Sequence, residues 1–209
     1  MRSAMIAAAG VLACLALAAG LAGCRIHEEN GPNGESKKVQ VDTPFGGIHV
    51  NTDQLTAADL GLPVYPGAQV VTGDDNHKSA DVHMGFGSFE MRIKVVSYSS
   101  NDSQEKVVAF YKKALTRFGD VITCQDHVAV GKPVATSEGL TCADDGNNVK
   151  VDAGAGSYDP KKGGFQLKAG SKRHEHVVGF ESAAPGTSHY SLVELDLPAM
   201  VEGKSDSSD

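Results

Sequence analysis

The chain has 209 residues and a formal net charge of -7 at pH 7, from 26 acidic and 19 basic side chains. A nucleic-acid-binding domain usually carries clustered positive charge, so this acidic balance argues against nucleic acid as a partner. Hydrophobic residues make up 41% of the chain and aromatic residues only 6%, with no tryptophan. We therefore expect a core built mostly from aliphatic side chains.

The first 23 residues have the composition of a secretory signal peptide. Arg2 is the only charged residue before Arg25, and the residues from Ile6 onward are small or apolar. A basic start, an apolar middle and small residues before a cleavage site define such signals. A transmembrane helix is the alternative, because a membrane span needs roughly 20 apolar residues.

The apolar stretch ends in Leu21-Ala22-Gly23-Cys24, which resembles the lipobox of bacterial lipoproteins. In that family the cysteine thiol receives a diacylglycerol, and the chain is cut just before the cysteine. The resemblance implies that residues 1–23 are removed and that Cys24 carries the lipid that attaches the protein to a membrane. In two-membrane bacteria, an aspartate after the cysteine commonly marks retention at the inner membrane. Arg25 stands there instead, so we expect an outer-membrane lipoprotein that faces the periplasm.

Residues 24–38 mix charged residues with Asn, Gly and Pro and contain a single apolar residue, which predicts a flexible tether. After the tether, alternating apolar residues on both sides of residues 44–47 predict a hairpin. A second hairpin is predicted where Gly87-Ser88 joins two alternating runs, because a Gly-X pair suits a type II′ turn. Phe86 and Phe89 should then face each other across that turn.

One amphipathic helix is predicted at about residues 103–118. Apolar residues recur there at helical spacing, and Asp102 and Glu105 match a capping box at its start. Short strands separated by Gly, Asp and Asn follow. This pattern predicts an α+β fold, a mainly antiparallel sheet with the helix packed on one face. We assign residues 39–200 to this single domain and residues 201–209 to a disordered tail.

The segment VYPGA at residues 64–68 and the helical segment FYKKAL at residues 110–115 resemble a module of uncharacterised bacterial lipoproteins. The usual pattern of that module is YPGA … FYKKxL … GW, and this chain has Gly119-Asp120 in place of the Gly-Trp pair. The resemblance covers roughly residues 60–125. It supports the predicted fold and the envelope location, and it implies no activity.

Two cysteines remain after Cys14 leaves with the signal peptide and Cys24 takes the lipid. A periplasmic compartment permits disulfides, so Cys124 and Cys142 are predicted to form one. Two free thiols are the alternative if the two strands do not meet. Neither cysteine belongs to a Cys-x-x-Cys motif, which disfavours a metal site.

The candidate residues for chemistry are His174 and His176. Two histidines two residues apart on a strand lie on the same face and can bind zinc or copper, with His189 on the following strand as a third ligand. The same face continues through Val178 and Phe180, so the two histidines can equally begin a half-buried face of the sheet.

No catalytic motif occurs in the sequence, which lacks the GxSxG of hydrolases, the HExxH of metalloproteases and a nucleotide-binding glycine loop. We therefore expect a binding or envelope-interaction protein without enzymatic activity and without a cofactor. Its expected partners are the membrane, through the lipid on Cys24, and another envelope protein. The alternative is a lipoprotein that binds a small ligand or a metal ion through His174 and His176.

Overall fold

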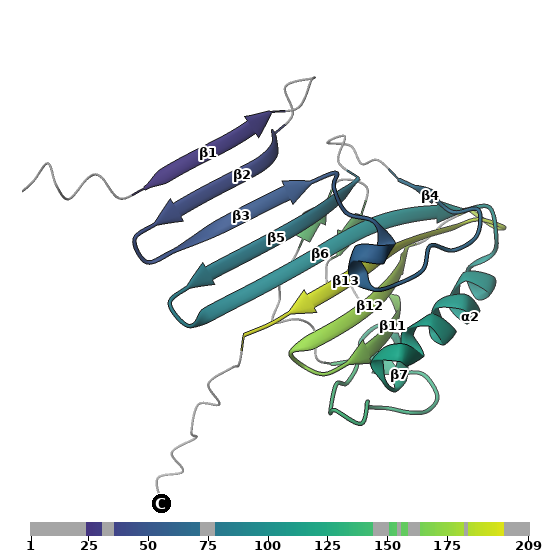
Figure 1. The fold of residues 1–209 in the computed structure, drawn as a ribbon. Coiled ribbons are helices and arrows are strands. Elements are labelled where there is room, and N and C mark those ends of the chain that lie inside the picture. Colours follow the sequence, from purple (N-terminus) through teal and green to yellow (C-terminus); the bar gives the residue numbers. More distant parts are fainter. Residues whose placement is uncertain are drawn as a thin grey trace, which may run out of the picture.

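The computed structural model describes residues 24–30, 36–71, 78–143, 151–153, 156–158, 164–181 and 184–198. These residues form a large antiparallel sheet together with one α-helix (Figure 1). The prediction of a mainly antiparallel sheet with a single helix is therefore confirmed for the described residues. The predicted signal peptide and the predicted tail lie outside them.

The main sheet has 11 strands, and its neighbouring strands are antiparallel. Their order from edge to edge is β1 (Arg25–Asn30), β2 (Ser36–Thr43), β3 (Gly46–Thr52), β5 (Ser79–Phe86), β6 (Phe89–Ser100), β13 (Ser188–Asp196), β12 (His174–Glu181), β11 (Phe165–Gly170), β7 (Val121–Gln125) and β8 (Val128–Ala129), with β4 (Gln69–Val70) paired to β6. The remaining elements are the ribbon β9 (Val151–Ala153) and β10 (Gly156–Tyr158), the helix α2 (Gln104–Leu115), and the 3-10 turns η1 (Ala57–Leu60) and η2 (Thr116–Phe118).

Both predicted hairpins are present. Residues 44–45 join β2 to β3, a shorter connection than the four residues that the sequence suggested. Gly87 and Ser88 join β5 to β6, and Phe86 pairs with Phe89 as predicted. Gly87 has a φ of 61°, a backbone conformation that glycine adopts without the steric cost of a side chain.

The N-cap residue of the helix is Ser103, one residue after Asp102, so the prediction that Asp102 caps the helix is wrong. The carboxylate of Asp102 instead binds the ammonium group of Lys106 and accepts a hydrogen bond of 3.0 Å from the hydroxyl group of Tyr65. Tyr65 is distant in sequence, and a local capping pattern cannot reveal this competing partner.

Two apolar clusters lie on opposite faces of the sheet, because successive residues of a strand alternate between the faces. In β6, Val96 and Tyr98 belong to the first cluster, and Ile93 and Val95 belong to the second. The first cluster also includes three buried residues of α2, namely Val107, Tyr111 and Leu115. We call the face that bears Val96 and Tyr98 the helix face.

The predicted disulfide between Cys124 and Cys142 is present, with the two Cα atoms 5.5 Å apart. Cys124 lies in β7 near one edge of the sheet. Both side chains are buried with Ile122 and Leu140 in a third apolar cluster. The disulfide therefore ties the segment that follows β8 to the sheet.

The structure differs from the tether predicted at residues 24–38, because β1 and the beginning of β2 lie within it. β1 is held by backbone pairing with β2 rather than by burial of its side chains, and Ile26 is 74% exposed. A prediction based on apolar alternation cannot detect such a strand. As a result, Cys24 directly precedes the edge strand of the sheet.

Candidate functional site

The predicted pair of histidines lies on β12, but the two side chains have different surroundings. His174 is exposed, and its Nδ1 atom lies 2.6 Å from Oδ1 of Asp196. His176 is half-buried, with its ring stacked on the ring of Phe118 at 3.5 Å between centroids. His189 lies at the opposite end of the β12–β13 pair. The structure therefore does not bring the three histidines together as metal ligands.

Within the described residues, no group of three His, Cys, Asp or Glu side chains is placed to hold a metal ion. His176 has a structural environment instead. The pKa of its imidazole is lowered to about 4, mainly by burial. The charge of Asp196 opposes this shift, and the charges of Lys94, Arg117 and His174 add to it. The Nδ1 atom of His176 is buried without a hydrogen-bond partner in the described structure. The neutral ring therefore packs as part of the helix face.

Acid is expected to destabilise the protein through His176. The pKa of this histidine is about 4 in the folded protein, and its ordinary value, which applies to the unfolded chain, is 6.5. Between these two pH values the unfolded chain binds a proton at this side chain and the folded protein does not. Stability therefore falls as the pH falls, and this group should lower the free energy of unfolding by up to about 2 kcal/mol between pH 7.5 and pH 5. Urea titrations at these two pH values should show a smaller loss for His176→Phe, which keeps a ring on Phe118. An equal loss in both proteins would contradict this assignment.

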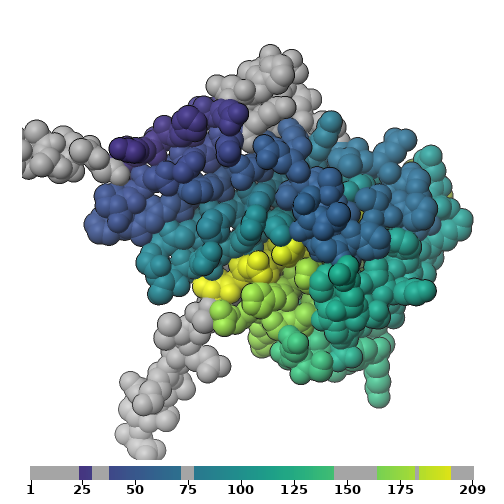
Figure 2. Space-filling view, viewed as in Figure 1, coloured from purple at the N-terminus to yellow at the C-terminus, as the bar shows by residue number. Residues whose placement is uncertain are grey.

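A line of polar side chains crosses the helix face over seven neighbouring strands. Cross-strand pairing places each member directly beside the next, on the same face of the sheet. From β1 to β12 the members are His27, Gln40, His49, His83, Arg92, Asp196 and His174. In the space-filling view, the strands β1 to β3 form a flank of this face that α2 does not cover (Figure 2).

Three histidines of this line each bind a carboxylate. His49 Nε2 lies 3.1 Å from Asp42 Oδ1, His83 Nε2 lies 3.0 Å from Glu90 Oε1, and His174 Nδ1 lies 2.6 Å from Asp196 Oδ1. We call these six side chains the histidine–carboxylate row. The hydrogen bond from His49 holds the pKa of Asp42 below its ordinary value. The row therefore carries polar groups in defined positions at the surface.

Two ion pairs hold the charged side chains next to the row. Arg92 donates two hydrogen bonds to the carboxylate of Asp81, at 2.9 and 2.6 Å. Lys94 lies 3.0 Å from Glu194 and also donates to the backbone carbonyl of Asp59. Side chains that are already fixed on rigid strands lose little conformational freedom when a partner binds. The arrangement is therefore suited to recognition of a polar surface.

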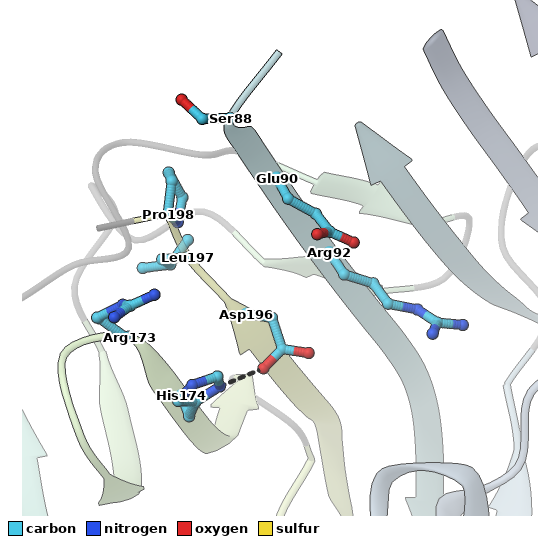
Figure 3. A pocket seen from close by; sticks show the side chains of 8 residues that line it. All are labelled: Ser88, Glu90, Arg92, Arg173, His174, Asp196, Leu197 and Pro198. Carbon is cyan, nitrogen blue, oxygen red and sulfur yellow. Dashed lines mark hydrogen bonds and ion pairs between the residues drawn. The ribbon is translucent and has the colours of Figure 1, made fainter. Parts of the chain in front are cut away.

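A shallow cavity of about 630 Å³ lies at one end of the row (Figure 3). Its lining comprises Ser88, Glu90, Arg92, Arg173, His174, Asp196, Leu197 and Pro198. Figure 3 shows His174 and Asp196 joined by their hydrogen bond and the guanidinium group of Arg92 directed away from them. Of the two predicted candidates, only His174 reaches this cavity, since His176 does not line it.

Sequence reasoning missed His49 and His83, although a signal was present. Asp42 and His49 are seven residues apart, and so are His83 and Glu90. In each case a hairpin turn lies between the histidine and the acid, so the two side chains meet across adjacent strands. The alignment of these pairs with His174 depends on the order of the strands in the sheet, and no local pattern gives that order.

No family model, no curated protein and no solved structure matches this chain. In the described part of the chain, no helix is both long enough and apolar enough to cross a membrane.

Proposed function

We propose that this protein is a lipoprotein of the bacterial cell envelope that is anchored through Cys24, faces the periplasm and binds another envelope protein without catalysing a reaction. The lipobox-like sequence that ends at Cys24 supports the lipid anchor. Arg25 in place of an aspartate supports the outer membrane. The disulfide between Cys124 and Cys142 agrees with an oxidising compartment outside the cytoplasm.

The observation that carries the binding role is the histidine–carboxylate row. The helix packs on the same face as the row and leaves the side chains of the row exposed, from 40% for Asp196 to 77% for Glu90. An ordered set of imidazole and carboxylate groups can match a complementary polar surface, which gives specificity as well as attraction. One end of the row lies near the proposed anchor, because Asp42 pairs with Arg25, the residue that follows Cys24. The anchored protein would therefore present this end of the row near the membrane.

The preference for binding over catalysis rests on the sequence, which contains no hydrolase, metalloprotease or nucleotide-binding motif. The carboxylates bonded to His49, His83 and His174 hold the three rings in fixed orientations at the surface.

A photo-crosslinking residue in place of His83 is expected to capture one dominant envelope protein in cells. The matched control carries the same residue in place of Val128, which is 67% exposed on the edge strand β8. Glu90→Lys should reduce the captured protein, because it reverses the charge of a side chain that is 77% exposed. Capture of the same proteins from both positions, or of none, would contradict a binding role for the row.

The second candidate function is the binding of a small ligand in the cavity at the end of the row. His174 lines this cavity together with Arg173, whose guanidinium group offers donors for an anionic group. His176 has no part in this candidate, because its ring packs on Phe118. A small molecule that stays bound to the purified protein and is lost in Arg173→Ala would favour this candidate.

A further inference from the structure

Three exposed phenylalanines gather at one end of the sheet. Phe45, in the turn between β2 and β3, is 84% exposed. Phe86 and Phe89 flank the turn between β5 and β6 and are 42% and 41% exposed. Figure 1 shows these two turns at the same end of the sheet as the start of β1. Large apolar side chains that collect on a surface mark a contact site.

The two turns form a single edge. The backbone N–H of Gly87 donates a hydrogen bond of 3.2 Å to the carbonyl group of Phe45. Gly46 pairs with Phe86, and a Cβ atom at Gly46 would lie only 2.7 Å from the Cα atom of Phe86. The two hairpins therefore meet through close backbone contact, which holds the three phenylalanines in one group. We call this group the phenylalanine edge.

Cys24 lies beside the phenylalanine edge. Arg25 pairs with Asp42 in the register of β1 and β2, so the preceding residue lies next to the end of β2 and the turn that carries Phe45. Cys24 is itself exposed. A lipid on its sulfur atom would therefore enter a membrane next to Phe45, without a flexible linker between the lipid and the sheet.

We propose that the phenylalanine edge rests on the lipid surface and inserts its three rings into the interfacial region of the membrane. This inference depends on the proposed lipid anchor at Cys24. Arg25 and Arg173 stand at the same end of the sheet together with the carboxylates of Asp42, Glu90 and Asp196. The membrane contact therefore rests on the apolar rings and not on charge. The inserted rings add apolar contact to the attachment that the acyl chains supply.

The absence of tryptophan from the chain allows a direct test with single-tryptophan reporters. The full-length, processed Phe45→Trp protein is reconstituted into vesicles of phosphatidylethanolamine and phosphatidylglycerol with brominated acyl chains, which quench tryptophan on contact. We expect its emission to shift to the blue and to lose most of its intensity, and we expect the same for Phe89→Trp. Val128→Trp is the matched control at the opposite edge of the sheet, and it should keep its intensity.

Flotation of the same vesicles separates the two ways in which the inference can fail. If the protein floats with the vesicles and the reporters at Phe45 and Phe89 are quenched no more than the one at Val128, the anchor stands and the membrane contact of the phenylalanine edge is wrong. If the protein does not float, the lipid anchor is wrong, and this inference fails with it. Phe45 is 84% exposed, so its replacement leaves the packed core untouched.

Discussion

Replacing Cys24 with serine is expected to move the protein out of the membrane fraction. Serine has no thiol group to receive a diacylglycerol, so the acyl chains that hold the protein are lost. Each buried methylene of an acyl chain contributes about 0.8 kcal/mol, and two or more chains together give a stable anchor. Fractionation of cells that produce the Cys24→Ser variant, followed by detection of the protein in each fraction, measures the effect.

The matched control for this experiment is Cys14→Ser, because Cys14 lies inside the predicted signal peptide. This control should remain in the membrane fraction and should be processed normally. If the Cys24→Ser variant stays in the membrane fraction and keeps residues 1–23, these residues form a transmembrane anchor. That result would support the transmembrane alternative to the signal peptide.

Removal of the disulfide should lower the stability of the protein more than acidification does through His176. The bond joins Cys124 to Cys142, which are 18 residues apart, and it restricts the unfolded chain. Loss of such a closed loop should lower the free energy of unfolding by about 3 kcal/mol in the chain-entropy model. Chemical unfolding of the double variant Cys124→Ala with Cys142→Ala measures this change against the wild-type protein.

Reduction provides the control for the double variant. A reducing agent should destabilise the wild-type protein and leave the double variant unchanged. Labelling of the unfolded, unreduced wild-type protein should find Cys124 and Cys142 blocked. Two reactive thiols in that experiment, or equal stability of the two proteins, would contradict the disulfide and its contribution.

Local sequence signals were sufficient for the parts of the fold that form locally. The pairing of Phe86 with Phe89 follows from a glycine turn between two alternating runs, and it is present in the structure. The helix α2 lies within the predicted residues 103–118 and buries three of the apolar residues that recur at helical spacing. These elements depend on turn conformation and periodicity, and a single sequence displays both properties.

The errors arose where distant residues decide the outcome. β1 carries almost no apolar residues and exists because its backbone pairs with β2, so its composition predicted a tether. Asp102 was predicted to cap the helix, but its carboxylate accepts a hydrogen bond from the distant Tyr65 and also binds the nearby Lys106. His176 was predicted as a candidate ligand, but the fold places its ring on Phe118.

The candidate site could be predicted only in part, because it too depends on contacts between residues that are distant in sequence. His174 was found from the sequence, and it is one member of the histidine–carboxylate row. His49 and His83 each meet an acid across a hairpin, which is a local event. Their alignment with His174 requires β13 to lie between β6 and β12, and that order is a property of the whole sheet.

The most direct test of the proposed lipid anchor is mass spectrometry of the amino-terminal peptide of the protein extracted from membranes. We expect a peptide that begins at Cys24 and carries a diacylglycerol on its sulfur atom. A chain that still contains residues 1–23, or a mature chain with an unmodified Cys24, would contradict the lipid anchor on which the proposed function and the membrane contact of the phenylalanine edge both depend.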